Sequence, residues 1–156
     1  DSGTGGLWAN DLVLPPDSVK SLQGVRVLEQ PPLITSFRPH MHMRGRAQSL
    51  QAVYPNGSRK MLARVDKYDH SWQINYEFAE DVAPLLPQGT MLMITSTWDN
   101  TAENPNNPDH RQWVVFGQRG VDEMSHLWLG ITYLSEDQFD RLTAERNARL
   151  TASNGE

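Results

Sequence analysis

The stretch Leu33-Ile34-Thr35-Ser36-Phe37-Arg38-Pro39-His40-Met41-His42 has the composition of a β-strand with two unlike faces. Successive side chains of a strand point to opposite faces of the sheet. The polar face carries Arg38, His40 and His42, and the other carries Phe37, Pro39 and Met41. Two imidazoles spaced in this way can reach one metal ion. The pair alone also fits two ordinary histidines on a solvated sheet face, so both interpretations stay open at this point.

Short runs of strand-forming residues recur along the rest of the chain, without helical segments between them. They are Gln23–Leu28, Leu33–His42, Gln48–Tyr54, Arg59–Val65, Trp72–Phe78, Met91–Trp98, Gln112–Phe116 and Met124–Leu134. Asn56-Gly57 between two of these runs is a strong hairpin signal. The pattern predicts an all-β fold, an antiparallel β-sandwich.

The two ends of the chain differ in character from this middle part. Residues 1–10 are expected to be a linker or N-terminal arm, and residues 11–134 the sandwich. Ser135-Glu136-Asp137-Gln138 is a capping-box pattern, which predicts a short C-terminal helix over residues 135–150. Arg146 interrupts the weak apolar face of that helix, which is expected to pack on the sandwich or to touch a partner. Residues 151–156 are expected to fray.

Composition excludes several classes of function. The 156 residues carry a net charge of -5 with both signs interspersed, which argues against a nucleic-acid partner. No apolar run is long enough to span a bilayer. The absence of cysteine excludes disulfides, zinc–thiolate sites and thiol nucleophiles, so a transition metal would need His, Met, Asp or Glu ligands. No signal segment opens the chain, so we expect a mature protein or a fragment of a longer one.

A third metal ligand is suggested by the stretch Met124–Leu134. Its alternation predicts a core face formed by Leu127, Leu129, Ile131 and Tyr133. Met124, His126 and Trp128 fall on the opposite face. Methionine usually fills cores, and packing on a half-buried face remains an alternative for Met124. A thioether beside two imidazoles is a soft, mixed ligand set that favours copper, especially Cu(I).

Two motifs far apart in the chain resemble one known family. Phe37-Arg38-Pro39-His40-Met41-His42-Met43-Arg44-Gly45-Arg46, followed by Gly120-Val121-Asp122-Glu123-Met124, is similar to the catalytic domain of the copper type II, ascorbate-dependent monooxygenases. That family includes peptidylglycine α-hydroxylating monooxygenase and dopamine β-monooxygenase. The resemblance covers residues 12–134 and is closest to the bacterial branch.

The resemblance implies a jelly-roll-like sandwich that binds one copper ion through His40, His42 and Met124, with an open position for dioxygen. It implies no catalytic residue separate from this metal site. Ascorbate or another electron donor would supply electrons for hydroxylation of a C–H bond. We expect Gln118, Asp122 or Glu123 to orient the imidazoles through their second ring nitrogens.

The resemblance also implies three weaker, substrate-binding candidates. Arg38 matches an arginine that helps to hold the substrate carboxylate in the peptide-hydroxylating branch. That branch has Asn and Tyr where this chain has His126 and Trp128. The difference argues against a peptide-glycine substrate, although Arg38 remains a candidate to hold an anion.

The family's electron-transfer domain, with its own three-histidine copper, has no counterpart in this chain. It is expected upstream, on a separate protein, or lost. Whether the chain is an enzyme is therefore left open. The alternatives are a non-catalytic structural or docking subunit of an envelope complex, and a protein for copper storage or delivery. The resemblance implies a periplasmic or extracellular location, with membrane association only through a partner.

Overall fold

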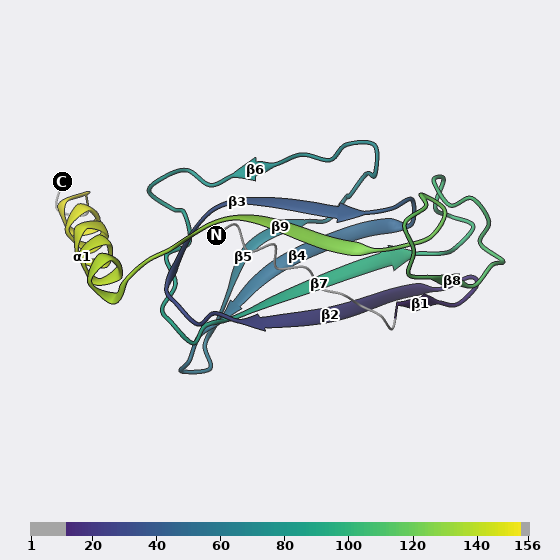
Figure 1. Ribbon diagram of the computed structural model, residues 1–156. Helices are drawn as coiled ribbons and strands as arrows, with labels where there is room; N and C mark the ends of the chain where they lie inside the picture. The colour runs from purple at the N-terminus through teal and green to yellow at the C-terminus, as the bar shows by residue number, and fades with distance from the viewer. Residues whose placement is uncertain (1–11, 154–156) are drawn as a thin grey trace.

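The computed structural model describes residues 12–153, which form a two-layered β-sandwich with one helix at its end (Figure 1). The expected arm at residues 1–10 lies outside the described residues, as do residues 154–156 of the expected frayed tail. The strands are β1 (Val13–Leu14), β2 (Val19–Val27), β3 (Pro32–Met41), β4 (Gly45–Val53), β5 (Arg59–Val65), β6 (Tyr76–Glu77), β7 (Met91–Asp99), β8 (Val114–Val115) and β9 (Ser125–Tyr133). The helix is α1 (Glu136–Ser153).

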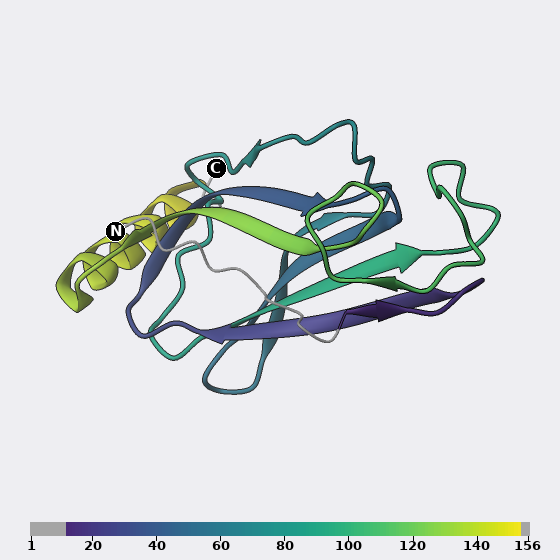
Figure 2. The same ribbon diagram turned by 45° about the vertical axis from the view of Figure 1, so that its right-hand side comes forward.

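Two antiparallel sheets make up the layers. The larger sheet has the strand order β2-β7-β4-β5, and the smaller has the order β6-β3-β9. A short pair, β1-β8, lies at the end of the molecule away from α1 (Figure 2). The predicted all-β sandwich is confirmed, while the jelly-roll connection stays a prediction.

The pairing of β3 with β9 determines which residues of the two motifs meet. Its register runs from Pro32 opposite Tyr133 to Met41 opposite Ser125, with an irregularity between Ile34 and Ser36. This register places Arg38 opposite Trp128 and His40 opposite His126. Directly opposed residues share a face, so these four side chains lie together on the outer face of the smaller sheet.

The core follows the predicted alternation. Phe37 and Met41 of β3 are buried between the layers, and Leu127 of β9 faces them. The main apolar cluster consists of Leu28, Ile34, Phe37, Leu50, Ala52, Leu86, Leu92, Ile94 and Leu127. A second cluster consists of Leu12, Leu14, Met41, Tyr68, Trp98 and Val114.

Two predicted strands are much shorter than expected. Of residues 72–78, only Tyr76–Glu77 pairs as a strand. A turn at residues 70–71 comes just before them, where Asp69 Oδ1 accepts hydrogen bonds from the backbone and hydroxyl of Ser71, and residues 72–75 form no regular structure. Of residues 112–116, only Val114–Val115 forms a strand, paired with a strand β1 that was not predicted, and Phe116 makes an isolated bridge to Glu123.

The helix begins as the capping box predicts. The Gln138 backbone donates to Ser135 Oγ at 3.3 Å, and the Ser135 backbone donates to Gln138 Oε1 at 2.9 Å. It continues to Ser153, so residues 151–153, which were expected to fray, are helical. Arg146 docks the helix by donating to the carbonyl oxygens of Ala83 at 2.6 Å and Glu80 at 3.2 Å.

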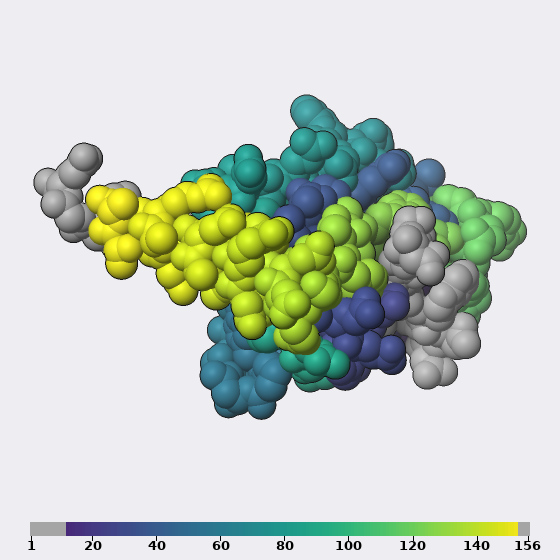
Figure 3. Space-filling model, turned by 60° about the vertical axis from the view of Figure 1, so that its left-hand side comes forward, coloured from purple at the N-terminus to yellow at the C-terminus, as the bar shows by residue number. Residues whose placement is uncertain are grey.

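The rest of α1 extends beyond the sandwich (Figure 3), and Leu150 is 61% exposed. Among the described residues there is no helix with the length and apolar character needed to cross a bilayer.

Candidate metal centre

His40 and His42 lie at the end of β3 that is remote from α1, and their rings approach each other. The ring centroids are 5.4 Å apart, with the rings nearly perpendicular. Two imidazoles on one tetrahedral metal, at nitrogen distances of about 2.0–2.1 Å, have centroids roughly 5–5.5 Å apart. The pair therefore has a spacing that one metal ion can bridge.

The residue between the histidines is tightly held. The Tyr68 hydroxyl accepts the Met41 N–H at 3.0 Å and donates to the Met41 carbonyl at 2.8 Å. Both bonds are buried. They hold the backbone that carries the two imidazoles in one position on the sheet edge.

Each imidazole is oriented through its Nδ1 atom. His40 Nδ1 lies 3.0 Å from Gln73 Oε1, and His42 Nδ1 lies 3.0 Å from the Asp122 carbonyl oxygen. A carbonyl acceptor favours the tautomer with its proton on Nδ1, which leaves the Nε2 lone pair available for a metal. Metal-ligating histidines are usually supported in this way.

Of the orienting groups expected from the sequence, Asp122 contacts the His42 ring, through its main-chain carbonyl oxygen. Its carboxylate pairs with Arg119 at 2.7 Å instead. Gln73 was missed, since it comes from a loop between two strands that no motif or spacing connects to His40.

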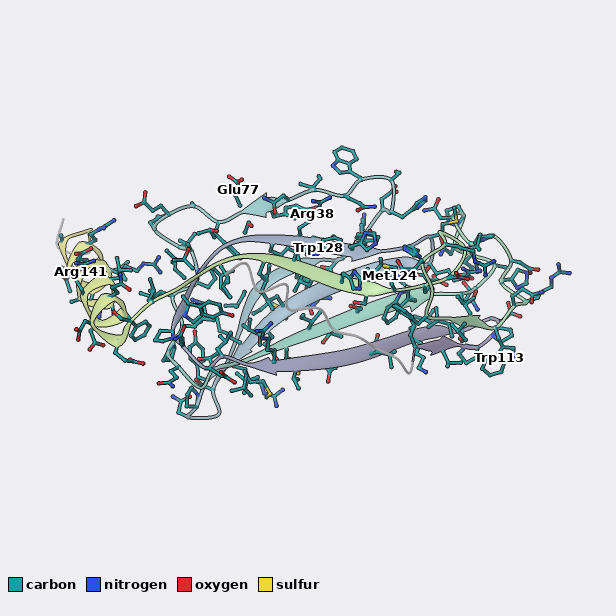
Figure 4. The ribbon with its side chains drawn as sticks, in the orientation of Figure 1. Arg38, Glu77, Trp113, Met124, Trp128 and Arg141 are labelled. Carbon is teal, nitrogen blue, oxygen red and sulfur yellow. The ribbon has the colours of Figure 1, made fainter. Side chains whose placement is uncertain are left out.

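Met124 immediately precedes β9 and lies at the same end of the sandwich as the end of β3 (Figure 4). Its side chain is only 4% exposed, so it is buried rather than half-buried on the outer face. It belongs to neither of the two apolar clusters. It is one of the buried apolar side chains of the sandwich, at the end that carries the two histidines.

Among residues 12–153, no three His, Cys, Asp or Glu side chains are arranged to hold a metal ion. A metal at the histidine pair would thus take a third ligand of another kind. Methionine sulfur is such a ligand, and it suits the same soft metal as imidazole does. The donor set His40, His42 and Met124 therefore fits copper by its chemistry.

His126 lies opposite His40, with ring centroids 6.0 Å apart. Burial lowers the pKa of both imidazoles. The neighbouring charges of His42, His126 and Arg38 lower the pKa of His40 further, against the hydrogen bond from Gln73, which raises it. Neutral imidazoles are the form that binds metals, and a lowered pKa favours that form for His40.

The two other weak candidates, Arg38 and Trp128, join the same surface (Figure 4). The Arg38 guanidinium lies over the Trp128 ring, 5.2 Å from its centroid. The Trp128 ring is 5.2 Å from that of His40 and 5.7 Å from that of His126. The structure thus brings Arg38, His126 and Trp128 together beside His40.

Glu123 joins the two ligand-bearing segments, a role that the sequence did not reveal. Its side chain is fully buried, and its carboxylate accepts N–H groups from His42 at 3.0 Å, Arg44 at 2.6 Å and the Trp98 indole at 3.1 Å. Burial raises the pKa of Glu123 to about 7, although these donors and the nearby Arg44 charge favour the carboxylate. Arg44 also donates to the Val121 carbonyl at 2.8 Å.

The two remaining histidines make no ring contact with His40 or His42, although the His70 carbonyl accepts a hydrogen bond from Gln73 Nε2 at 3.3 Å. His110 pairs with Asp17, and His70 lies 3.9 Å from Asp69.

Comparison with known proteins gives no assignment: no family model matches the chain, and no curated protein matches it significantly.

Proposed function

We propose that this chain is a copper-binding β-sandwich in which His40, His42 and Met124 hold one copper ion. The observation that carries the proposal is the pair of oriented imidazoles, each bound at Nδ1 by a carbonyl oxygen and 5.4 Å apart between ring centroids. The third donor in this proposal is the Met124 thioether, which is buried at the same end of the sandwich as the two histidines. Copper bound there would supply dioxygen reduction for hydroxylation of a C–H bond, with electrons from ascorbate or a protein donor.

The chain's own residues contribute orientation and electrostatics to this activity. Gln73 and the Asp122 carbonyl fix the imidazole planes, so that both Nε2 atoms remain available to the metal. Trp128 and Arg38 cover the adjacent surface, where a substrate would lie. Arg38 would attract an anionic group there.

A second candidate, a non-catalytic docking subunit, is favoured by two observations. Arg38 is stacked on Trp128 at the positions where the resembling family binds substrate. Helix α1 extends beyond the sandwich and exposes Leu150. In this alternative the chain belongs to a larger envelope complex, periplasmic or extracellular, and the metal would be structural. Oxygen consumption with ascorbate separates the two when it is measured on copper-loaded protein freed of unbound copper, because free copper itself oxidises ascorbate. Only the enzyme should exceed the rate of His40→Ala/His42→Ala treated in the same way.

The copper site itself is tested by binding stoichiometry. The wild type should retain one copper per chain after dialysis, and His40→Ala/His42→Ala should retain almost none. The matched control is His110→Ala, which removes a histidine that pairs with Asp17 and should bind like the wild type. Equal retention by the wild type and by His40→Ala/His42→Ala would rule out the assignment.

A further inference from the structure

We infer that Glu123 is a positioning residue, whose buried carboxylate holds the segment of His42 against the segment of Met124. This inference rests on the proposed copper site. It adds that the position of the sulfur ligand relative to the imidazoles is set by one side chain, which links two segments about eighty residues apart in sequence.

The carboxylate matches the tight turn between β3 and β4. One oxygen accepts the His42 N–H at 3.0 Å, and the other accepts the Arg44 N–H at 2.6 Å. The turn is closed by the Gly45 N–H, which donates to the His42 carbonyl at 3.0 Å. Gly45 is required there, because an added Cβ would lie 2.6 Å from Met41 Cβ. The two oxygens of one carboxylate thus satisfy two N–H groups of a compact turn that carries a ligand.

The backbone of Glu123 is fixed independently of its side chain. Its N–H donates to the Val115 carbonyl at 3.2 Å, and its carbonyl accepts the Gly117 N–H at 3.0 Å. The main chain before Met124 is therefore attached to β8, while the side chain reaches the β3–β4 turn. The hydrogen bonds from the β3–β4 turn to the Glu123 carboxylate therefore tie the two segments together. The hydrogen bond between His42 Nδ1 and the Asp122 carbonyl oxygen is a second tie between the same segments.

The tie depends on a group with two acceptor oxygens in a fully buried position. No water can replace a lost bond there without rearrangement, since the Glu123 side chain is 0% exposed. An amide accepts hydrogen bonds through one oxygen only. In Glu123→Gln, either His42 or Arg44 therefore faces an NH₂ group instead of an acceptor, although the side-chain volume is nearly unchanged.

The consequence differs between the ligands. His40 and His42 are both attached to the end of β3 and stay together when the tie is lost. Met124 belongs to the other segment, so its sulfur should move away from the metal. Glu123→Gln should therefore still bind copper through two imidazoles, but its affinity for Cu(I) should fall roughly 10- to 100-fold.

The matched control is Trp98→Phe. The Trp98 indole is the third donor to Glu123, but it comes from β7 and carries no ligand. This variant destabilises the buried cluster while it leaves the carboxylate on the β3–β4 turn. A purely structural role for Glu123 predicts the same behaviour for both variants.

The experiment loads wild type, Glu123→Gln and Trp98→Phe with Cu(I). It measures the sulfur contribution to the copper X-ray absorption spectrum, the Cu(I) affinity by chelator competition, and unfolding of the metal-free protein in urea. Sulfur should be present in the wild type and Trp98→Phe and lost in Glu123→Gln. If Glu123→Gln does not fold, Glu123→Asp replaces it, because its shorter side chain keeps both oxygens but cannot span both segments.

Retention of the sulfur signal and of wild-type Cu(I) affinity in Glu123→Gln, or in its Asp replacement, would overturn the inference while leaving the copper site intact. Equal loss of sulfur in Trp98→Phe would also overturn it. Absence of sulfur from the wild type would instead contradict the proposed function itself.

Discussion

The two ends of the sandwich are held together by different interactions. At the end near α1, the layers meet through apolar side chains such as Leu28, Ile34 and Leu92. At the opposite end, the candidate metal centre depends on buried polar groups, among them Arg44 and Glu123. The first end is stabilised by burial of apolar area, which needs no specific partner. The second combines an apolar cluster of its own, which includes Met41 and Trp98, with hydrogen bonds that its buried polar groups must find.

The difference predicts how each end responds to substitution. Loss of an apolar group should lower the stability of the whole sandwich without affecting copper. Loss of a polar tie should act mainly on the metal centre.

The largest expected effect comes from the apolar end. Leu50→Ala removes a side chain that is fully buried in the main cluster, so it loses burial and leaves a cavity. It should lower the free energy of unfolding by about 3 kcal/mol, measured by urea unfolding of the metal-free protein. Its copper stoichiometry should equal that of the wild type. A loss of copper in the folded variant would mean that the two ends are not separable.

The next effect is the pH dependence caused by Glu123. Its pKa is raised from 4.5 to about 7, so the folded chain holds this proton more tightly than the unfolded chain. Its contribution to stability is complete below pH 4.5 and is lost as the pH rises through 7, about 3 kcal/mol in all. The stability difference between wild type and Glu123→Gln should therefore fall between pH 4.5 and 8.

The variant comparison is needed because His40 and His126 act in the opposite direction. Their lowered pKa values make the folded state less stable as the pH falls below 6.5. A difference between wild type and Glu123→Gln that stays constant with pH would show that the carboxylate is not perturbed by burial.

A smaller effect is expected for the residue that orients His40. Gln73→Ala removes the acceptor from His40 Nδ1, so copper affinity should fall roughly 10- to 100-fold, measured by chelator competition. Stability should hardly change. The matched control is Gln23→Ala, which removes a glutamine that bonds Thr95 on the larger sheet. Equal copper affinities of Gln73→Ala and Gln23→Ala would show that Gln73 does not support His40 as a ligand.

The smallest effect is expected at the helix. Ser135→Ala removes the cap of α1, which should lower helix stability by about 1 kcal/mol. Faster amide hydrogen exchange in residues 136–140 should report this, with copper binding unchanged. Unchanged exchange would mean that the Arg146 contacts alone fix the helix.

The apolar end was largely predictable from sequence, because alternation in β3 and β9 identifies Phe37, Met41 and Leu127 as core residues. The capping box likewise predicted the start of α1, since it is a local signal. The structure extends α1 past residue 150 to Ser153, and Arg146, which was expected only to interrupt the apolar face of the helix, contacts the sandwich.

The metal centre was predictable only in part. The His-x-His spacing places two imidazoles on one face because strand geometry is local. The roles of Gln73 and Glu123 depend on loops that meet through the pairing of distant strands. No periodicity encodes the contact between such loops. Most of the strand expected from Trp72 is instead part of the loop that carries Gln73, after the turn at Asp69 and Ser71.

The most direct test is the X-ray absorption spectrum of the Cu(I)-loaded wild type beside that of Met124→Leu. One copper coordinated by two imidazoles and a sulfur is the predicted result for the wild type, with the sulfur contribution absent in Met124→Leu. A wild-type spectrum without sulfur, or a sulfur signal that survives in Met124→Leu, would contradict the assignment of Met124 as a ligand.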